Sequence, residues 1–583
     1  MNIFKDFLNK NKIEYSIEEN VLEKNSEDTS LFKIIPKVVV FPKNKEEISL
    51  LTKFVNSHKG FNITGRSGGT DMSGGAVNDS IILSFTKYFN KTISVNKIEK
   101  LATVEPGVFY RDFEKETLKQ NLLLPSYPAS REICALGGMV SNNSGGELSF
   151  QYGQTKKYVE ELECVLSNGE IVNIKALSEK ELQDKLVGAS EEFKNTLEYK
   201  IYNEIFNLLN DPKNKEIIKT NTPIVSKNSS GYFLWDALRQ ENTSTSSVAK
   251  KETIFDLNKI IVGSQGTLAI VTKIKVKLIE PKKHTKMLLI FLKDLRELGR
   301  VRRVVMKYNP ESFESYDDHT FKVAMKFFPA LVKNIFLKNK NKSSFTMIKM
   351  VFSFWREAFL VLTFGMPKLI LLVEFTGDSE EEILERLVNC NQEIKNSFRK
   401  AVKTQAVKHD YEEEKYWTMR RESFNLLRQK VKGLHTSPYI DDIIVPADML
   451  EEFLEELIPI LDKYKLLYTV AGHVGDGNLH IIPLMNFDDS ATKEKNLKII
   501  KDCSNEVYAL VKKYHGSITA EHNDGLIRTP FLGEIFDKEM LNLFRQVKNI
   551  FDPKNILNPR KKISIHEDNS KDFEDNLKFV KFK

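Results

Sequence analysis

Short apolar runs and amphipathic segments alternate along the chain. Residues 37–41 (KVVVF) form a β-branched run, and residues 44–60 then carry apolar residues at helical spacing up to Gly60. Two further apolar runs, FNIT at 61–64 and IILSF at 81–85, flank a loop dense in glycine. This pattern predicts the order strand, helix, strand, strand at the start of the first domain.

The middle of the chain predicts a hairpin, then helices, then strands. The segment LECVLSNGEIVNI is typical of a hairpin that turns at Asn168–Gly169, and polar helical segments follow to about residue 220. The segment KIIVGSQGTLAIVTKIKVKLIEP predicts two strands around Gly263–Gly266 and a domain boundary at Pro281.

The second half alternates apolar strands with amphipathic helices. The predicted strands are KMLLIFL, KLILLVEF, LLYTVAGHV and LHIIPL, and the predicted helices are SEEEILERLVNCNQEI, DMLEEFLEELIPILDKY and EKNLKIIKDCSNEVYALVKKY. This alternation indicates an α+β domain. We therefore expect an N-terminal helical extension at 1–35, a first domain at 36–280, a second domain at 281–562 and a disordered charged tail at 563–583.

Length and composition narrow the class of protein. At 583 residues the chain is too long for one core, and 41% hydrophobic with 29% charged residues is typical of a soluble multidomain protein. The net charge of +7 is small for this length and indicates no nucleic-acid partner. The four cysteines include no CxxC pair, so any redox cofactor must be held by other residues. We find neither a secretion signal nor a run of roughly 18 apolar residues, so a cytoplasmic location is expected.

One segment departs from this pattern. Residues 321–350 contain seven lysines and no acidic residue, interleaved with apolar residues, within an insertion at about 320–366. A basic amphipathic stretch of this kind can lie on the anionic inner face of a membrane or dock a partner. It can equally be a solvated helix face, because charge runs usually are.

Two glycine-dense patches carry the first functional signal. Gly65–Gly75 holds five glycines and residues 136–146 hold four, which together are nine of the chain's 27. Clustered glycines let backbone N–H groups approach a phosphate or a ring edge. The spacing matches neither the dinucleotide-binding GxGxxG turn nor the GK[ST] nucleotide loop, so a different phosphate-binding loop is expected.

Four sequence blocks in order resemble one flavoprotein family. PKVVVFPKNKEEI, ITGRSGGTDMSGGAV, PSYPASREICALGGMVSNNSGGELSFQYG and IVGSQGTLAIVT resemble the FAD-binding domain of vanillyl-alcohol-oxidase-type flavoproteins. KLILLVEFTGD, YWTMRRESF, VAGHVGDGNLH, GSITAEHNDG and FDPKNILNP resemble the cap domain of the D-lactate dehydrogenase, glycolate oxidase and D-2-hydroxyglutarate dehydrogenase group. The resemblance covers roughly residues 30–562. It implies an α+β fold with a two-subdomain FAD-binding domain followed by an α+β cap (substrate) domain.

The resemblance implies which residues bind FAD. The first loop, implied to receive the pyrophosphate, is Gly65, Arg66, Ser67, Gly68, Gly69, Thr70 and Asp71, continued by Ser73 and Gly74. The segment implied to pass the isoalloxazine and ribityl chain contributes Pro128, Ala129, Ser130, Gly137, Gly138, Asn142, Asn143, Ser144 and Gly145. The late strand implied to close over the adenine contributes Gly263, Thr267, Leu268, Ala269 and Ile270. Relatives with covalent FAD use a His or Cys in this region, and the first loop offers neither, so non-covalent FAD is expected.

Two histidines predict a metal site. In HVGDGNLH a two-residue turn at Asp476–Gly477 would place His473 directly opposite His480 on one face of a hairpin. Such a pair can bind a metal or can serve packing and hydrogen bonding. The resemblance implies Glu521 as the third ligand, and this donor set suits zinc first, with iron or manganese as alternatives.

The resemblance also implies the chemistry. His522 matches the family's proposed general base, and Arg420 matches an arginine that pairs with the substrate carboxylate. Two positions depart from the family pattern, since Asn523 replaces a glycine and Ile440 replaces a lysine that meets a second carboxylate. A dicarboxylate substrate is therefore less expected. The longer relatives carry a cysteine-rich iron–sulfur domain that this chain lacks, so electrons are expected to leave through a separate acceptor.

The main hypothesis is an FAD- and metal-dependent D-2-hydroxy-acid dehydrogenase, with D-lactate as the first substrate to test. The hydride would pass to flavin N5 and the electrons to a quinone, a cytochrome or an iron–sulfur protein. A non-redox transferase of the alkylglycerone-phosphate synthase type is the second hypothesis. The third is a flavoprotein subunit that docks to a membrane or partner through residues 321–350.

Overall fold

The computed structural model describes most of the chain. The described residues are 1–243, 250–318, 321–322, 355–398, 401–407, 409, 412–420, 434–487, 490–564, 566 and 569–581. All but the first two residues of the basic segment 321–350 lie outside this set. The membrane or partner contact predicted for that segment therefore stays a prediction. None of the described helices is both long enough and apolar enough to span a bilayer.

The chain begins with a small, mostly parallel sheet. Its strands are β1 (Tyr15–Ser16), β2 (Val38–Val40), β4 (Ile81–Ser84) and β3 (Ile63–Arg66), in that spatial order. Helix α3 (Lys45–Ser57) connects β2 to β3, and Asn44 caps it by accepting a hydrogen bond from the Glu47 N–H. Strand β2 is buried throughout, as is typical of parallel sheets covered on both faces. The predicted order strand, helix, strand, strand is confirmed.

The N-terminal segment joins this sheet rather than standing apart from it. Helices α1 (Asn2–Lys10) and α2 (Glu19–Lys24) flank β1, which pairs antiparallel with β2. Phe4 and Leu8 of α1 are fully buried in the same hydrophobic cluster as β2. The predicted helical extension is therefore part of the core of the first half of the chain.

A second, antiparallel sheet follows. Its spatial order is β5 (Thr92–Asn96), β6 (Leu101–Val104), β12 (Ile270–Lys277), β7 (Val159–Val165) and β8 (Ile171–Lys175). Strands β7 and β8 form the hairpin predicted around Asn168–Gly169. Of the two strands predicted around Gly263–Gly266, the second is β12. The prediction of the first is wrong, because Asn258–Ile261 form the short helix α12. Asp256 starts that helical turn by accepting from the Asn258 N–H, so the local polar side chain overrides the β-branched pattern.

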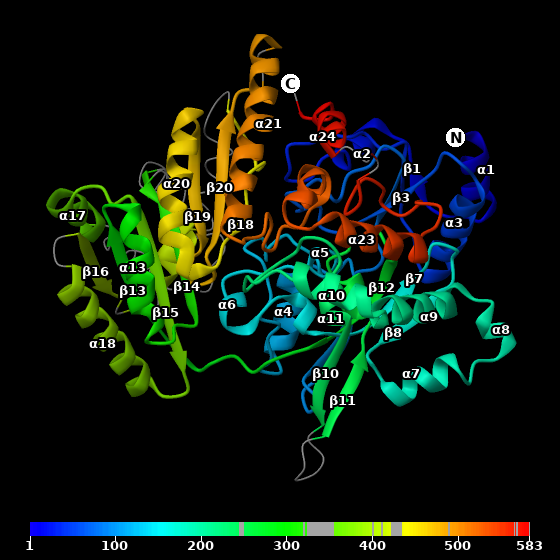
Figure 1. Ribbon diagram of the computed structural model, residues 1–583, viewed down its shortest axis with the longest axis horizontal. Helices are drawn as coiled ribbons and strands as arrows, with labels where there is room; N and C mark the ends of the chain where they lie inside the picture. Colours follow the sequence, from blue (N-terminus) through cyan, green and yellow to red (C-terminus); the bar gives the residue numbers. More distant parts are fainter. Residues whose placement is uncertain are drawn as a thin grey trace.

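Helices cover the sheets of the first half. They are α4 (Tyr110–Leu118), α5 (Leu136–Asn142), α6 (Ser149–Tyr152), α7 (Glu179–Leu186), α8 (Glu191–Lys194), α9 (Leu197–Asn210), α10 (Pro212–Asn221) and α11 (Leu234–Ala237). A three-stranded sheet adds β9 (Leu177–Ser178), β10 (Leu238–Thr243) and β11 (Lys250–Phe255), and the β10–β11 hairpin projects from the lower edge of the molecule (Figure 1). Helix α23 (Lys538–Phe551) returns from the far end of the chain to pack on α9.

The second half is built on a large antiparallel sheet. The order is β16 (Val402–Ala406), β13 (His284–Leu292), β15 (Leu369–Gly377), β14 (Ser312–Asp317), β19 (Leu467–His473), β20 (Asn478–Met485) and β17 (His435–Thr436), with β18 (Ile443–Ile444) beside β20. The four strands predicted for this half are β13, β15, β19 and β20. The α+β fold with two successive parts is confirmed.

The two faces of this sheet have different roles. In β13, Leu288 and Ile290 lie in the core shared with α13 (Leu298–Met306), α18 (Glu380–Phe398), α20 (Leu450–Lys463) and α21 (Ser490–Lys513). Met287 and Leu289 alternate with them and lie in a separate cluster on the opposite face. In Figure 1, α13, α18 and α20 lie with the sheet at the left of the molecule, and the first half of the chain lies at the right. The face of the sheet that carries Met287 and Leu289, here called the inner face, is not covered by these helices and is available to build a site between the two halves.

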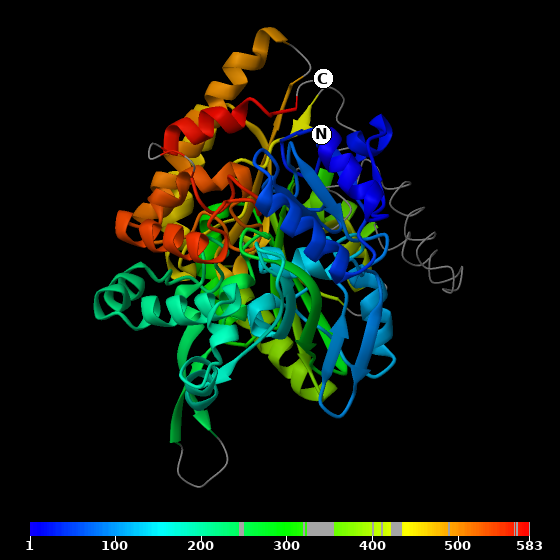
Figure 2. The ribbon, with the colours of Figure 1, turned by 90° about the vertical axis from the view of Figure 1, so that its right-hand side faces the viewer.

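The C-terminal segment completes the first half. Asn558 donates through Nδ2 to the carbonyls of Gly75 and Gln265, at 2.9 and 2.6 Å. The 563–583 tail, predicted to be disordered, contains helix α24 (Asn569–Leu577), so that prediction is wrong. Phe573 is buried, with its ring centroid 4.8 Å from that of Phe531. Helix α24, red in Figures 1 and 2, lies in the upper part of the molecule, and beyond it the Lys581 N–H donates to the Leu31 carbonyl.

Candidate functional site

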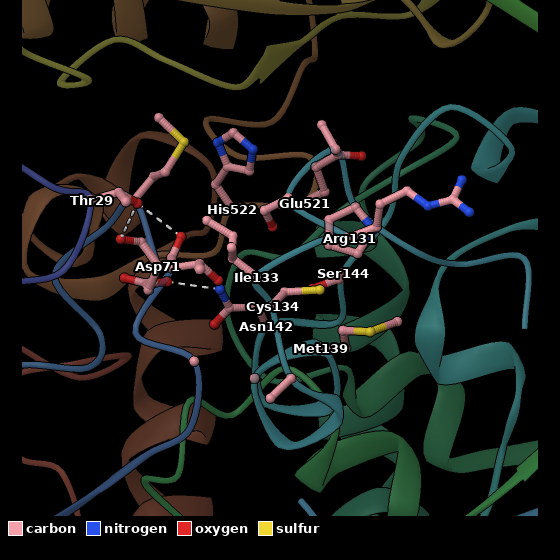
Figure 3. Close-up of a pocket in the computed structure, with 18 of the residues that line it drawn as sticks. Thr29, Asp71, Arg131, Ile133, Cys134, Met139, Asn142, Ser144, Glu521 and His522 are labelled. Carbon is pink, nitrogen blue, oxygen red and sulfur yellow. Dashed lines mark hydrogen bonds between the residues drawn. The ribbon is translucent and has the colours of Figure 1, made fainter. Parts of the chain in front are cut away.

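One large cavity separates the glycine loops from the inner face of the cap sheet. Its volume is about 1270 Å³, above the roughly 300–1,000 Å³ typical of small-ligand pockets. It has room for a long cofactor together with a small substrate. Figure 3 shows the loop residues Asp71, Asn142 and Ser144 on one side, with Glu521 and His522 close by.

Glycines bring backbone to the cavity wall. Gly68 has no space for a side chain, because an added Cβ would lie 2.6 Å from the Ile133 carbonyl oxygen. At Gly138, which lines the cavity, an added Cβ would meet no protein atom within 4 Å and would occupy the cavity itself. This cradle of exposed backbone fits a cofactor with a phosphate chain.

Asp71 holds the first glycine loop in shape. Its Oδ2 accepts from the N–H groups of Ser73 and Gly75 at 2.9 and 2.7 Å, and its Oδ1 accepts from Asn142 Nδ2 at 2.7 Å. Thr29 donates to the Asp71 carbonyl at 2.8 Å (Figure 3). The two glycine patches are therefore linked by side-chain hydrogen bonds.

Most residues predicted to bind FAD line the cavity. They are Gly65, Ser67, Gly68, Gly69, Thr70, Asp71, Pro128, Ala129, Ser130, Gly137, Gly138, Asn142, Ser144, Gly145, Ala269 and Ile270. Arg66, Ser73, Gly74, Asn143, Gly263, Thr267 and Leu268 do not line it. They lie behind the loops, where, for example, Arg66 donates to the carbonyl oxygens of Glu27 and Ala76.

The cavity also contains residues that the sequence analysis missed. Thr29, Met72, Ile133, Cys134 and Gln265 are among its lining residues. Cys134 and Gln265 lie inside two of the sequence blocks that resemble the FAD-binding domain, so their place in these blocks could have identified them. Thr29 comes from the N-terminal segment, and no local pattern identifies it.

At the cap end, the three predicted metal ligands and the predicted base come together. Glu521 Oε1 lies 2.9 Å from His473 Nε2 and 3.7 Å from His480 Nε2. The ring centroids of His480 and His522 are 4.8 Å apart. One group of possible ligand atoms within 4.8 Å of one another comprises Asp442, His480, Glu521 and His522.

The hairpin that carries two of these histidines has a different register from the prediction. His473 pairs with Asn478 and His480 pairs with Ala471, so the two histidines are diagonal neighbours and not directly opposite. The reason is a longer loop, because Val474–Asp476 form a 3₁₀ turn that Gly477 closes at φ +79. A shift of two residues keeps both side chains on one face, and their ring centroids are 5.2 Å apart.

Each histidine is backed by a carboxylate at Nδ1. Glu314 Oε1 lies 2.6 Å from His473 Nδ1, and the two oxygens of Asp441 lie 3.2 Å from His480 Nδ1 and 2.6 Å from His522 Nδ1. A carboxylate at one ring nitrogen fixes the tautomer and leaves the other nitrogen as a ligand. This arrangement is typical of metal-binding histidines.

The donor set fits a cation. When its proton is on Nδ1, the Nε2 atom of His473 carries a lone pair, which faces the Glu521 carboxylate at 2.9 Å. Two acceptors at this distance need a proton or a metal ion between them. Imidazole and carboxylate ligands suit zinc, iron or manganese.

The buried charges of the site point the same way. The described side chains include five buried carboxylates, Glu314, Asp441, Asp442, Asp476 and Glu521, and three buried cations, Lys227, Arg420 and Arg528. With neutral imidazoles, two negative charges remain, and burying unbalanced charge is costly. A divalent cation, or one extra proton on each of two imidazoles, would balance them.

The neighbouring carboxylates also raise the pKa values of two of the histidines. Burial lowers the pKa of His473, but Glu314 and Glu521 outweigh burial and raise it to about 9. Burial also lowers the pKa of His522, but Asp442 and Asp441 outweigh burial and raise this pKa to about 9.

Glu314 and Lys227 are two of the charged site residues that the sequence analysis missed; Asp441, Asp442, Asp476 and Arg528 are others. Glu314, on β14, forms an ion pair with Arg420, which lines the cavity; Arg421 lies outside the described residues. Lys227, from the first half of the chain, is buried with its Nζ 2.8 Å from Glu521 Oε2 and 3.3 Å from Asp476 Oδ2. Neither residue lies in a recognisable motif, and only the fold brings them here.

Asn523 and Ile440 are the two residues that depart from the family pattern, and they lie in different surroundings. Asn523 adopts φ +68, the left-handed conformation that suits glycine and is tolerated by asparagine. Its Nδ2 donates to the carbonyls of Asn142 and Gly263, at 3.1 and 2.9 Å, and so joins the cap to the cofactor loops. Ile440 is fully buried in the core.

Two family models match the chain. The FAD binding domain matches residues 36–175, and the C-terminal domain of FAD linked oxidases matches residues 281–562.

Relatives include several 2-hydroxy-acid enzymes. The chain is 28% identical to the D-2-hydroxyglutarate dehydrogenase of Escherichia coli over 92% of its length, but it spans only 49% of that protein, about half its length. It is 25% identical to the glycolate oxidase subunit GlcD of Bacillus subtilis, covering 91% of this chain and 90% of the relative. It is also 25% identical to the D-lactate dehydrogenase of Anaerostipes hadrus, covering 90% of each.

Solved structures show the same fold at low identity. The 4-ethylphenol oxidase of Gulosibacter chungangensis has a TM-score of 0.63 at 13% identity, covering 97% of each chain. An alkyldihydroxyacetonephosphate synthase has a TM-score of 0.58 at 14% identity, covering 94% of this chain and 82% of the other. An oxidase and a synthase are thus both similar to this chain in fold, and fold alone does not choose between their reactions.

Proposed function

Because the chain belongs to the FAD-linked oxidases, we propose that it is an FAD-dependent dehydrogenase that oxidises a D-2-hydroxy acid to the 2-oxo acid. The observation that carries this proposal is that a single cavity is lined by both the glycine loops and the histidine–glutamate cluster. A reducible cofactor and a group that activates an alcohol can therefore act on one substrate.

The first half of the chain would hold FAD. The lining backbone of the two glycine patches would receive its phosphates, and the bound flavin would supply the hydride acceptor. Cys134 lines the same cavity, but burial raises the pKa of its thiol to about 12. A thiol held in its neutral form is a poor nucleophile, which favours non-covalent FAD.

The cap would prepare the hydroxy acid. His473, His480 and Glu521 would hold a divalent cation, zinc being the first choice, which would make a bound hydroxyl more acidic. His522 would take the hydroxyl proton, with its ring oriented by Asp441 at 2.6 Å. Arg420 would bind the substrate carboxylate through the N–H groups that face the cavity.

One residue that departs from the family pattern bears on the substrate class. Ile440, at the position where the resembling family has a lysine for a second carboxylate, is buried in the hydrophobic core and does not line the cavity. This favours a monocarboxylate, with D-lactate first, over D-2-hydroxyglutarate. The electrons would then pass to a separate quinone, cytochrome or iron–sulfur protein.

The test is an anaerobic visible spectrum of the zinc-replete protein. It is titrated with D-lactate, L-lactate, glycolate, D-2-hydroxyglutarate and longer D-2-hydroxy acids. Bleaching of the flavin band by one D-acid is expected. Bound flavin that none of these acids bleaches would contradict the dehydrogenase proposal and favour a non-redox reaction.

A further inference from the structure

The structure points to Glu314 as a positioning residue that orients both the carboxylate-binding Arg420 and the metal ligand His473. We infer that this one side chain ties substrate binding to metal binding. The inference rests on the proposed function, in which these two residues hold substrate and cation.

Glu314 stands between its two partners. It lies in β14, directly opposite His473 in β19, and only 1% of the residue is exposed. Its Oε1 is 2.6 Å from His473 Nδ1, and its Oε2 forms the ion pair with Arg420 Nη2. Each carboxylate oxygen therefore serves a different partner.

Glu314 does not itself reach the substrate. It is absent from the residues that line the cavity, whereas Arg420 and His473 both line it. Its effect must pass through these two side chains. By accepting from His473 Nδ1, it leaves Nε2 free to bind a metal, and by pairing with Arg420 it fixes where the guanidinium presents its other N–H groups.

Only a carboxylate can serve both partners. His473 Nδ1–H and the Arg420 guanidinium are both donors, so both oxygens must accept. A glutamine offers one acceptor oxygen and one NH₂ group, which would face a donor. The variant Glu314→Gln has nearly the same shape and therefore separates charge and acceptor number from packing.

The first measurement needs no hydroxy acid. Equilibrium dialysis against buffered free zinc should show that Glu314→Gln weakens zinc binding about 10- to 100-fold, the usual cost of losing a carboxylate behind a metal-binding histidine. The matched control is Glu163→Gln. Glu163 lies in β7 of the second sheet, and its buried carboxylate pairs with Lys45 and Lys273. The control should bind zinc as the wild type does.

The second measurement is kinetic. At saturating zinc, Glu314→Gln should raise the KM for the hydroxy acid about tenfold or more, with a smaller change in kcat, because Arg420 loses its anchor while His522 keeps Asp441. Wild-type zinc affinity together with wild-type KM in this variant would overturn the inference.

The FAD content of the purified variant and a second variant with a shorter side chain distinguish a folding defect from a local effect on Arg420 and His473. If Glu314→Gln is purified without FAD, Glu314→Asp keeps the charge but is too short to reach both partners, so zinc affinity or KM should still change. Wild-type values of both in Glu314→Asp would overturn the inference. If no hydroxy acid bleaches the wild-type flavin, the proposed function fails, and the zinc measurement still decides whether Glu314 orients His473.

Discussion

Lys227 donates to Glu521 across the boundary between the two halves of the chain, with Nζ 2.8 Å from Oε2. Both residues are at least 95% buried, and Asp476 lies 3.3 Å from the same Nζ. The ion pair leaves Glu521 Oε1 to the imidazoles, so a residue of the first half of the chain orients the proposed metal ligand Glu521 of the second half.

Replacing this lysine should destabilise the protein. Lys227→Met leaves two buried carboxylates uncompensated, and losing one member of a buried ion pair costs about 3–5 kcal/mol. Denaturant unfolding in zinc-free buffer measures this loss. Lys227→Arg keeps the charge and should lose much less; equal losses would show that shape matters more than charge.

Filling the cofactor cradle should remove the flavin while leaving the fold intact. Gly138 lies in helix α5 with open cavity beside it, so Gly138→Leu places its side chain where the cofactor would lie. We expect at least a tenfold fall in the ratio of flavin to protein absorbance. Gly60→Asn, at a left-handed position that also has open space beside it, is the control and should keep its flavin. Retained flavin in Gly138→Leu would place the cofactor elsewhere.

Loss of a cap histidine should separate flavin binding from turnover. His480→Ala should keep its yellow colour but reduce flavin bleaching by the substrate more than about 100-fold, because a metal ligand matters at least as much as the group behind it. A chelator should have the same effect on the wild type, reversed by added zinc. His58→Ala, directly after α3 and beside Phe54, is the control. Full activity in His480→Ala would remove the metal from the mechanism.

Glu374 should make stability depend on pH. Burial, together with Glu147, Glu311 and Glu413, raises the pKa of Glu374 to about 8. The folded protein therefore holds a proton that the unfolded chain releases above about pH 4.5, so stability falls as pH rises from about 4.5 to 8.

A glutamine at this position should remove that dependence. Glu374→Gln is expected to be more stable than the wild type by about 4 kcal/mol at pH 8 and by less than about 1 kcal/mol at pH 5. Denaturant unfolding at the two pH values measures the difference. Glu116→Gln, on the exposed side of α4, should show no such pH-dependent gain. A gain that is equal at pH 5 and pH 8 would contradict the raised pKa.

The C-terminal helix should contribute strongly to stability. Phe573 packs against Phe531 at 4.8 Å, and deleting a buried phenylalanine side chain costs about 3–5 kcal/mol. The loss for Phe573→Ala can be measured by denaturant unfolding. Lys578→Ala, on an exposed side chain next to the helix, should cost little; a similar loss in both would mean that the helix does not pack as described.

The sequence predicted those features that local patterns determine. Strands β13, β15, β19 and β20 follow from apolar runs, and the shared face of His473 and His480 follows from the two-residue period of a strand. The family resemblance then placed Glu521 beside them, and the distance of 2.9 Å to His473 agrees with that expectation.

The features that the sequence missed depend on contacts between distant segments. Glu314 lies 159 positions from His473, and Lys227 lies 294 positions from Glu521, so no local period can pair them. The register of the hairpin depends on a 3₁₀ turn that competes with a two-residue turn of the same composition. The tail forms a helix because Phe573 finds a partner in Phe531, which a count of charged residues does not reveal.

The contacts of the C-terminal segment with the first half of the chain have a consequence for folding during synthesis. Asn558 ties the first glycine loop to Gln265, and the segment that ends at Lys581 bonds to Leu31, two residues from Thr29. The first half of the chain is therefore translated before the cap but obtains its last supporting contacts only after the cap has left the ribosome. A nascent chain that still lacks residues 552–581 has its glycine loops and the hydrogen bonds of Asp71 within them, but not the contacts from Asn558, so we expect tight cofactor loading to follow synthesis of the cap.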